Sequence, residues 1–221
     1  MTDIEAALAG RKNPAAAMPR QALLSCFILA ALAMLPTQVY RLGADQALPW
    51  LLADYAGRLM AIGVLLALPA GRWCLRRKDD LKVGTLEAGA WVLGIVLLFH
   101  ATPLDAMLAS YFPQSPLGSY PSPKGLLYAF DITLGLALVA LHEELVFRKL
   151  ADHVMRAFGW GFWRIIIVSA ILFGLYHWWR APAGMLAAAI YGVLAMICYR
   201  RTGSLWPIGF AHYVIDYFYF A

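Results

Sequence analysis

The sequence predicts an all-α membrane protein, a polytopic bundle of about seven transmembrane helices. Of its 221 residues, 62% are hydrophobic and only 14% are charged, and its mean hydropathy is +0.66. Soluble domains carry about 25% charged residues, so this composition excludes a soluble globular protein and also a disordered chain. Because a transmembrane helix takes about 20 residues, some seven spans with short loops use up the whole length.

The apolar residues lie in seven continuous runs. Backbone polar groups must be paired inside the lipid, so each run is expected to be a helix. Pro103 and the four prolines at 113, 116, 121 and 123 predict an irregular loop over 104–124. The first stop signal after residue 147 is Gly159, so the fourth helix can continue to about residue 157. The runs are 21–40, 48–70, 86–103, 125 to at least 147, 162–180, 182–199 and 204–220.

The positive charges alternate from one side of the predicted bundle to the other. Most of the 18 Lys and Arg residues lie in the polar leader 1–20 or in the loops after the second, fourth and sixth runs. This asymmetry predicts a cytoplasmic N-terminus in a membrane, most simply the bacterial inner membrane. It also explains the net charge of +5 without a nucleic-acid partner. The three cysteines are far apart in the sequence and suggest neither a disulfide framework nor a metal motif.

Ionisable side chains inside apolar runs are costly and indicate function. The segment 141–148, LHEELVFR, places two adjacent carboxylates in the fourth run. Glu144 and Arg148 are four residues apart and can pair on one helix face. Glu143 points about 100° away, so it is expected to be unpaired and able to take a proton from water. An interfacial charge cluster is the alternative, whereas a zinc-protease HExxH motif is excluded because residue 146 is Val.

Two later runs carry histidines. His177 follows Phe173 by four residues in the fifth run, and His212 precedes Asp216 by four in the seventh. The second pair shares a helix face and can hydrogen-bond, an arrangement that orients an imidazole as catalyst or as metal ligand. Each histidine alone could be interfacial. Together with Glu143 they predict a site inside the bundle that activates water or holds a metal.

Two further polar features are expected to be structural. Asp54 and Arg58, four residues apart in the second run, are interpreted as a self-satisfied ion pair. Asp131, in the fourth run, is expected to make a structural hydrogen bond, although it could also line the cavity.

The three polar segments resemble the three motifs of the CPBP (Abi) family, which includes the type II CAAX prenyl endopeptidases. The family's EExxxR is matched by 143–148, its FxxxH by 173–177, and its HxxxN or HxxxD by 212–216. The spacings, 34 residues from Glu143 to His177 and 35 from His177 to His212, also resemble the family. We therefore divide the chain into residues 1–124, a leader with three spans, and residues 125–221, a family-like helix bundle.

The resemblance implies an intramembrane endopeptidase of the glutamic type, without a cofactor or metal. Glu143 and His177 would activate water, while His212 and Asp216 would face the scissile carbonyl oxygen. The supporting residues would be Glu144, Arg148 and Phe173. The substrate would be a membrane-associated protein or peptide, such as a lipidated or sorting-signal-bearing protein.

The sequence departs from the more common motif at Asp216, because an ionised Asp repels an oxyanion where Asn would donate to it. Asp216 could instead orient and charge His212, which we favour, or it could be a ligand in a Zn-dependent variant. Two other functions stay open. One is a catalytically silent chaperone, scaffold or immunity protein on the same fold. The other is a transporter, which would show an internal repeat that we do not find.

Overall fold

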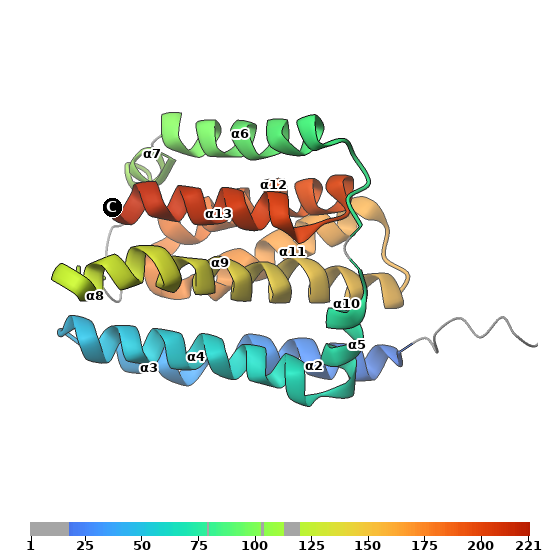
Figure 1. The fold of residues 1–221 in the computed structure, drawn as a ribbon, viewed down its shortest axis with the longest axis horizontal. Helices are drawn as coiled ribbons and strands as arrows, with labels where there is room; N and C mark the ends of the chain where they lie inside the picture. The colour runs from blue at the N-terminus through green and yellow to red at the C-terminus, as the bar shows by residue number, and fades with distance from the viewer. Residues whose placement is uncertain (1–17, 79, 103, 113–119) are drawn as a thin grey trace, which may run out of the picture.

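The all-α fold is confirmed. A computed structural model describes residues 18–221 except for 79, 103 and 113–119, and within these described parts every regular element is a helix. The long helices run side by side along one direction, whereas the short helices α5 and α7 lie across it, and the C-terminus is at the end of the bundle opposite to the first residues of α2 (Figure 1). Most of the predicted polar leader, including Arg11 and Lys12, lies outside the described residues.

All seven apolar runs contain helices, although several bounds differ from those predicted. The first run is broken near Pro36, and the second ends because Leu68 is extended before Pro69. The stretch 104–124 is not wholly irregular, since it begins with a short helix, α7; residues 113–119 of the predicted loop lie outside the described part. The N-terminal elements are α2 (Arg20–Leu32), α3 (Leu35–Arg41), α4 (Ala47–Ala67), α5 (Pro69–Arg76), α6 (Thr85–Ala101) and α7 (Leu104–Ala109).

The second half of the chain contains one long helix and three others. The long helix, Gly125–Ala157, has 33 residues and twice widens into π-helical turns. It consists of α8 (Gly125–Phe130), η1 (Asp131–Gly135), α9 (Leu136–Glu144), η2 (Leu145–Leu150) and α10 (Ala151–Ala157). It is followed by α11 (Phe162–Tyr176), the 3₁₀ turn η3 (Trp178–Arg180), α12 (Ala181–Thr202) and α13 (Leu205–Phe220).

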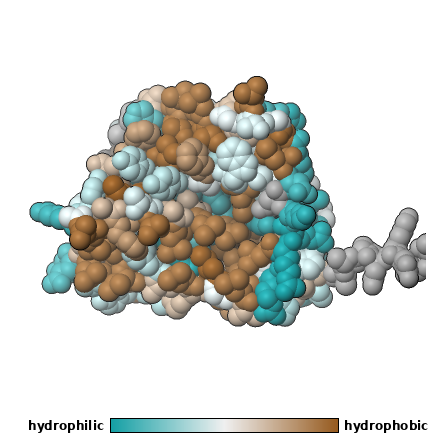
Figure 2. Space-filling model, in the orientation of Figure 1, coloured by the Kyte–Doolittle hydropathy of each residue, from teal (hydrophilic) through white to brown (hydrophobic). Residues whose placement is uncertain are grey.

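The protein is an integral membrane protein. Four helical stretches are long and apolar enough to cross a membrane, namely Arg20–Arg41, Ala47–Ala67, Gly125–Ala157 and Trp178–Thr202. The helices α6, α11 and α13 have 17, 15 and 16 residues, so the number of seven spans stays a prediction. Figure 2 shows apolar residues over the middle of one face and hydrophilic residues gathered at the end where α5 and α10 end.

The length of Gly125–Ala157 decides the depth of the first motif. A straight helix that stopped near residue 147 would place Glu143 close to one membrane surface, far from His177. Because the helix continues to Ala157, as expected from Gly159, Glu143 lies near the middle of its 33 residues. The motif therefore sits at the depth where the other helices can meet it.

Helices α11 and α12 approach closely through small residues, as is common in membrane bundles. A Cβ atom at Gly174 would lie 2.7 Å from the carbonyl oxygen of Met185 and 2.9 Å from Cβ of Ala189. A Cβ atom at Gly192 would lie 3.0 Å from Cα of Ala170. Two glycines thus allow the backbones of α11 and α12 to pack against each other.

Gly174→Ala should destabilise the bundle by about 1–3 kcal/mol, because backbone atoms of α12 cannot move away from the added methyl group. We expect a lower melting temperature in detergent. Gly94→Ala on α6 is the matched control, since nothing lies within 4 Å of its added Cβ. Equal melting temperatures for the two variants would contradict close packing at Gly174.

Candidate active site

The three predicted motifs meet inside the bundle. Glu143 is at the end of α9, His177 caps α11 and His212 is on α13. The Oε2 atom of Glu143 lies 3.8 Å from Nε2 of His177 and 3.8 Å from Nε2 of His212. Among the described residues, this buried Oε2 has no hydrogen-bond partner. Three side chains from three helices therefore direct proton-accepting or proton-donating atoms toward one small space.

Glu143 is not the unpaired carboxylate that helix spacing predicts. Its Oε1 accepts a hydrogen bond of 2.7 Å from Nη1 of Arg58, on α4. The expectation was wrong because it considered only partners on the same helix, whereas α4 packs against α9. The guanidinium stabilises the ionised carboxylate, the form that accepts a proton, and it occupies one oxygen so that the other stays available.

Arg58 bridges two carboxylates rather than pairing with Asp54 alone. Its Nε donates to Asp54 at 2.8 Å, and its Nη1 also lies 3.3 Å from Nδ1 of His142. Asp54 in turn pairs with Arg41, whose guanidinium lies over the ring of Trp50 at 4.5 Å. The interpretation of Asp54 and Arg58 as a self-satisfied pair is therefore incomplete. The signal in the sequence was the presence of ionisable residues in an apolar run.

Glu144 and Arg148 form the ion pair expected from their spacing, at 3.0 Å, and are 1% and 0% exposed. Two more groups join them. Nδ1 of His212 donates to Glu144 at 2.8 Å, and the hydroxyl of Tyr191 donates at 3.3 Å. The guanidinium of Arg148 also lies 4.3 Å from the ring centre of Phe173, a cation–π distance. This pair thus connects the first motif to both of the others.

The second motif has a structural reason for its spacing. Nδ1 of His177 donates to the carbonyl oxygen of Phe173, four residues earlier, at 2.8 Å. Because a carbonyl only accepts, Nδ1 carries the proton and Nε2 has the free lone pair. Phe173 also packs its ring at 4.7 Å from the imidazole. The motif therefore fixes the tautomer of His177 and aims Nε2 at Glu143.

The third motif is held differently from the prediction. Nε2 of His212 lies 3.5 Å from Oδ2 of Asp216, whereas its Nδ1 is only 2.8 Å from Glu144. The nearest partner that orients the ring is thus Glu144 on another helix, which residue spacing within α13 could not reveal. Asp216 stays near the ring and lines the same cavity.

Asp131 makes the structural hydrogen bonds expected of it and also lines the cavity. Its carboxylate accepts from the hydroxyls of Tyr55 and Tyr120. Tyr120 packs its ring against Trp50 and Phe220, at 5.3 and 4.8 Å. These aromatic groups form the wall of the cavity at the end of the bundle that holds the C-terminus.

The cavity around the three motifs has a volume of about 720 Å³. A stripe of small residues on α12, which includes Ala183, Gly184 and Ala187, lines the cavity, and so do apolar residues of α6. From Glu143 the cavity extends toward His100, Trp179 and Phe220, at the end of the bundle where the C-terminus lies. Its shape and lining suit an apolar chain that leads to a polar centre.

Within the described part of the chain, no group of three or more His, Cys, Asp and Glu side chains is arranged to hold a metal ion. The set Glu143, His177, His212 and Asp216 contains suitable Zn donor types, but Glu144 holds one nitrogen of His212 and Arg58 holds one oxygen of Glu143. The expectation of a metal-free site stays a prediction.

Residues 125–218 match the family model of the type II CAAX prenyl endopeptidase Rce1-like proteins. The match covers all three motifs and confirms the resemblance for this part of the chain. At the level of the family, it supports an endopeptidase of the membrane. No curated protein and no solved structure gives a significant match to the chain.

If Arg58 chiefly neutralises Glu143 and Asp54, then Arg58→Met should cost about 3–5 kcal/mol of folding free energy, because it leaves buried charges unpaired. The cost should fall by about 0.5–3 kcal/mol in a Glu143→Gln background, where one of those charges is already gone. Unfolding of the four proteins in detergent gives this coupling energy. Additive effects of the two substitutions would show that the Arg58–Glu143 contact does not stabilise the fold.

Proposed function

We propose that this protein is an intramembrane endopeptidase that hydrolyses a peptide bond of a membrane-associated protein or peptide. One observation carries the proposal. Oε2 of Glu143 and the Nε2 atoms of His177 and His212 face one point inside a membrane-embedded cavity, 3.8 Å from carboxylate to each ring. That separation is too long for a direct hydrogen bond, and it allows one water molecule to contact both the carboxylate and His177.

Glu143 acts as the general base. Water bound by Glu143 Oε2 and by the free lone pair of His177 attacks the carbonyl carbon, and its proton moves to Oε2. The ion pair with Arg58 keeps the carboxylate charged and in place before the attack. The proton on Glu143 then passes to the nitrogen of the leaving amine when the C–N bond breaks.

His212 stabilises the oxyanion. Glu144 holds Nδ1 of the ring, so only Nε2 points into the cavity, and this atom donates to the oxyanion when the imidazole is protonated. Three carboxylates lie within 4 Å of the ring, at 2.8 Å for Glu144, 3.5 Å for Asp216 and 3.8 Å for Glu143. They supply the negative charge that a protonated imidazole requires. In this proposal Asp216 charges His212 and does not touch the substrate oxygen.

The substrate reaches the site through the apolar cavity. We place its mouth at the end of the bundle that holds the C-terminus, because the residues that line the cavity extend from Glu143 to Tyr219 and Phe220. If the N-terminus is cytoplasmic, as the positive charges predict, this mouth faces away from the cytoplasm of a bacterial inner membrane. The orientation therefore favours a substrate segment that enters from the outer side, such as the tail of an exported precursor.

Glu143→Gln should lower cleavage by roughly 10²–10⁴-fold, the usual cost of removing a general base. The substrate is identified first, as the membrane protein whose processing stops when this chain is deleted. The variants are then compared in cells and with purified protein in detergent.

Glu87→Gln is the matched control, since it makes the same chemical change at a carboxylate of α6 that pairs with Arg201 outside the cavity. It should cleave normally. If the Glu143→Gln protein restores processing in the deletion strain, the proposed protease mechanism is wrong. A non-catalytic chaperone or scaffold is then the better interpretation.

Asp216→Asn should be tolerated, with activity within about tenfold of the unchanged protein. Glu144 still holds His212 in this variant, and Asn is the residue more common in the resembled motif. Activity, metal content by elemental analysis and the effect of EDTA are measured together. We expect no stoichiometric metal and little effect of EDTA.

A metal ligand at position 216 would produce the opposite result, because a neutral amide is a poor Zn ligand. About one Zn per chain in the unchanged protein, lost in Asp216→Asn together with activity, would make this enzyme a metalloprotease.

A further inference from the structure

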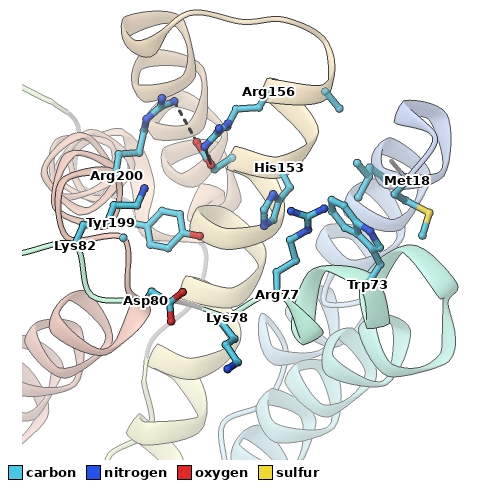
Figure 3. A pocket seen from close by; sticks show the side chains of 14 residues that line it. Met18, Trp73, Arg77, Lys78, Asp80, Lys82, His153, Arg156, Tyr199 and Arg200 are labelled. Carbon is cyan, nitrogen blue, oxygen red and sulfur yellow. Dashed lines mark ion pairs between the residues drawn. The ribbon is translucent and has the colours of Figure 1, made fainter. Parts of the chain in front are cut away.

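A second pocket lies at the other end of the bundle, away from the candidate active site. It has a volume of about 600 Å³ and lies between the ends of α2, α5, α10 and α12. Figure 3 shows basic and aromatic side chains from these separate elements directed around it. None of its lining residues also lines the cavity that holds Glu143.

Positive charge dominates this basic-end pocket. Its lining contains five Lys and Arg side chains and two carboxylates, which are Asp80 and Asp152; the cations are Arg77, Lys78, Lys82, Arg156 and Arg200. Asp152 is 4% exposed and pairs with Arg200 at 3.1 Å and with Arg156 at 3.7 Å. One buried carboxylate thus holds two arginines at the rim, as the dashed line to Arg200 indicates in Figure 3.

Three of the cations form no ion pair within the part of the chain that the structure describes, namely Arg77, Lys78 and Lys82. The Arg77 guanidinium lies 4.2 Å from the ring centre of Trp73, a contact that orients it. An anion bound in the pocket could therefore pair with positive charges that have no ion-pair partner among the described residues.

The backbone around the pocket is anchored. Buried Lys149 donates to the carbonyl oxygen of Arg77 at 2.8 Å, and the backbone N–H of Lys82 donates to the carbonyl oxygen of Thr202 at 2.6 Å. These contacts fix the two ends of the segment that carries the free cations. The backbone that carries Arg77 and Lys82 is therefore held against the bundle.

The position and the apolar side of the pocket indicate the class of ligand. Helix α2 begins here and α5, α10 and α12 end here. This is the level where a bundle leaves the hydrocarbon, and Trp73 is of the residue type enriched at that level. Met18 and Leu23 also line the pocket, together with Trp73. A ligand that fits both sides carries a phosphate next to an apolar chain.

We propose that the basic-end pocket binds the phosphate headgroup of an anionic phospholipid from the adjoining leaflet. Arg77, Lys78 and Lys82 contact the phosphate, and the acyl chain leaves along Met18 and Leu23. Basic pockets between transmembrane helices commonly bind lipid headgroups in this way. The proposal does not depend on the protease function, because the two cavities share no residue.

The test measures binding to the purified full-length protein in neutral detergent, by titration calorimetry and native mass spectrometry. The probes are dihexanoyl phosphatidylglycerol, dihexanoyl phosphatidylcholine, glycerol 1-phosphate and inorganic phosphate. We expect phosphatidylglycerol to bind and phosphatidylcholine to bind at least tenfold more weakly. The double variant Lys78→Gln/Lys82→Gln should weaken the binding of phosphatidylglycerol by about 25-fold, because each cation near the headgroup contributes roughly fivefold to the affinity.

Arg76→Gln/Arg164→Gln is the matched control, because it removes the same charge at the same end from residues that do not line the pocket. It should change binding less than threefold. Equal weakening by both double variants would show general attraction to the basic end and overturn the proposed site. Glycerol 1-phosphate or phosphate binding as tightly as phosphatidylglycerol would overturn a lipid as the ligand, and so would equal binding of the two lipids.

Discussion

The contact between Arg58 and Glu143 is the constraint on which the site depends. A carboxylate deep in a membrane bundle is stable as an ion only beside a cation, and α4 supplies that cation from a part of the chain outside the three motifs. The same guanidinium also donates a hydrogen bond to Asp54, and Asp54 forms a second ion pair with Arg41. The N-terminal half thus does more than cover the motif helices, since it neutralises the charge at their centre.

The long helix Gly125–Ala157 places that charge at the correct depth. Its π-helical turns at η1 and η2 contain Asp131 and Arg148, and such turns recur at functional sites because they redirect side chains. Arg148 then reaches Glu144, Phe173 and Tyr191 together. A single helix therefore serves as the axis around which α4, α11 and α13 arrange their polar groups.

The two ends of the bundle have different chemistry. The cavity around Glu143 reaches one end through apolar and aromatic walls, while the other end carries the basic pocket in which Asp152 holds two arginines. The membrane environment explains this difference between the two ends. Apolar walls suit a chain that arrives from lipid, and clustered cations suit the anionic surface of a leaflet.

The sequence alone determined the all-α class, the seven apolar runs and the Glu144–Arg148 pair, because these depend on composition and on contacts four residues apart in one helix. It also predicted that residue 143 and the two histidines belong to one site. Only the tertiary structure decided the partners of Glu143 and His212. Arg58 lies 85 residues from Glu143 and Glu144 lies 68 from His212, and helix periodicity carries no information on which helices pack together or how they are rotated.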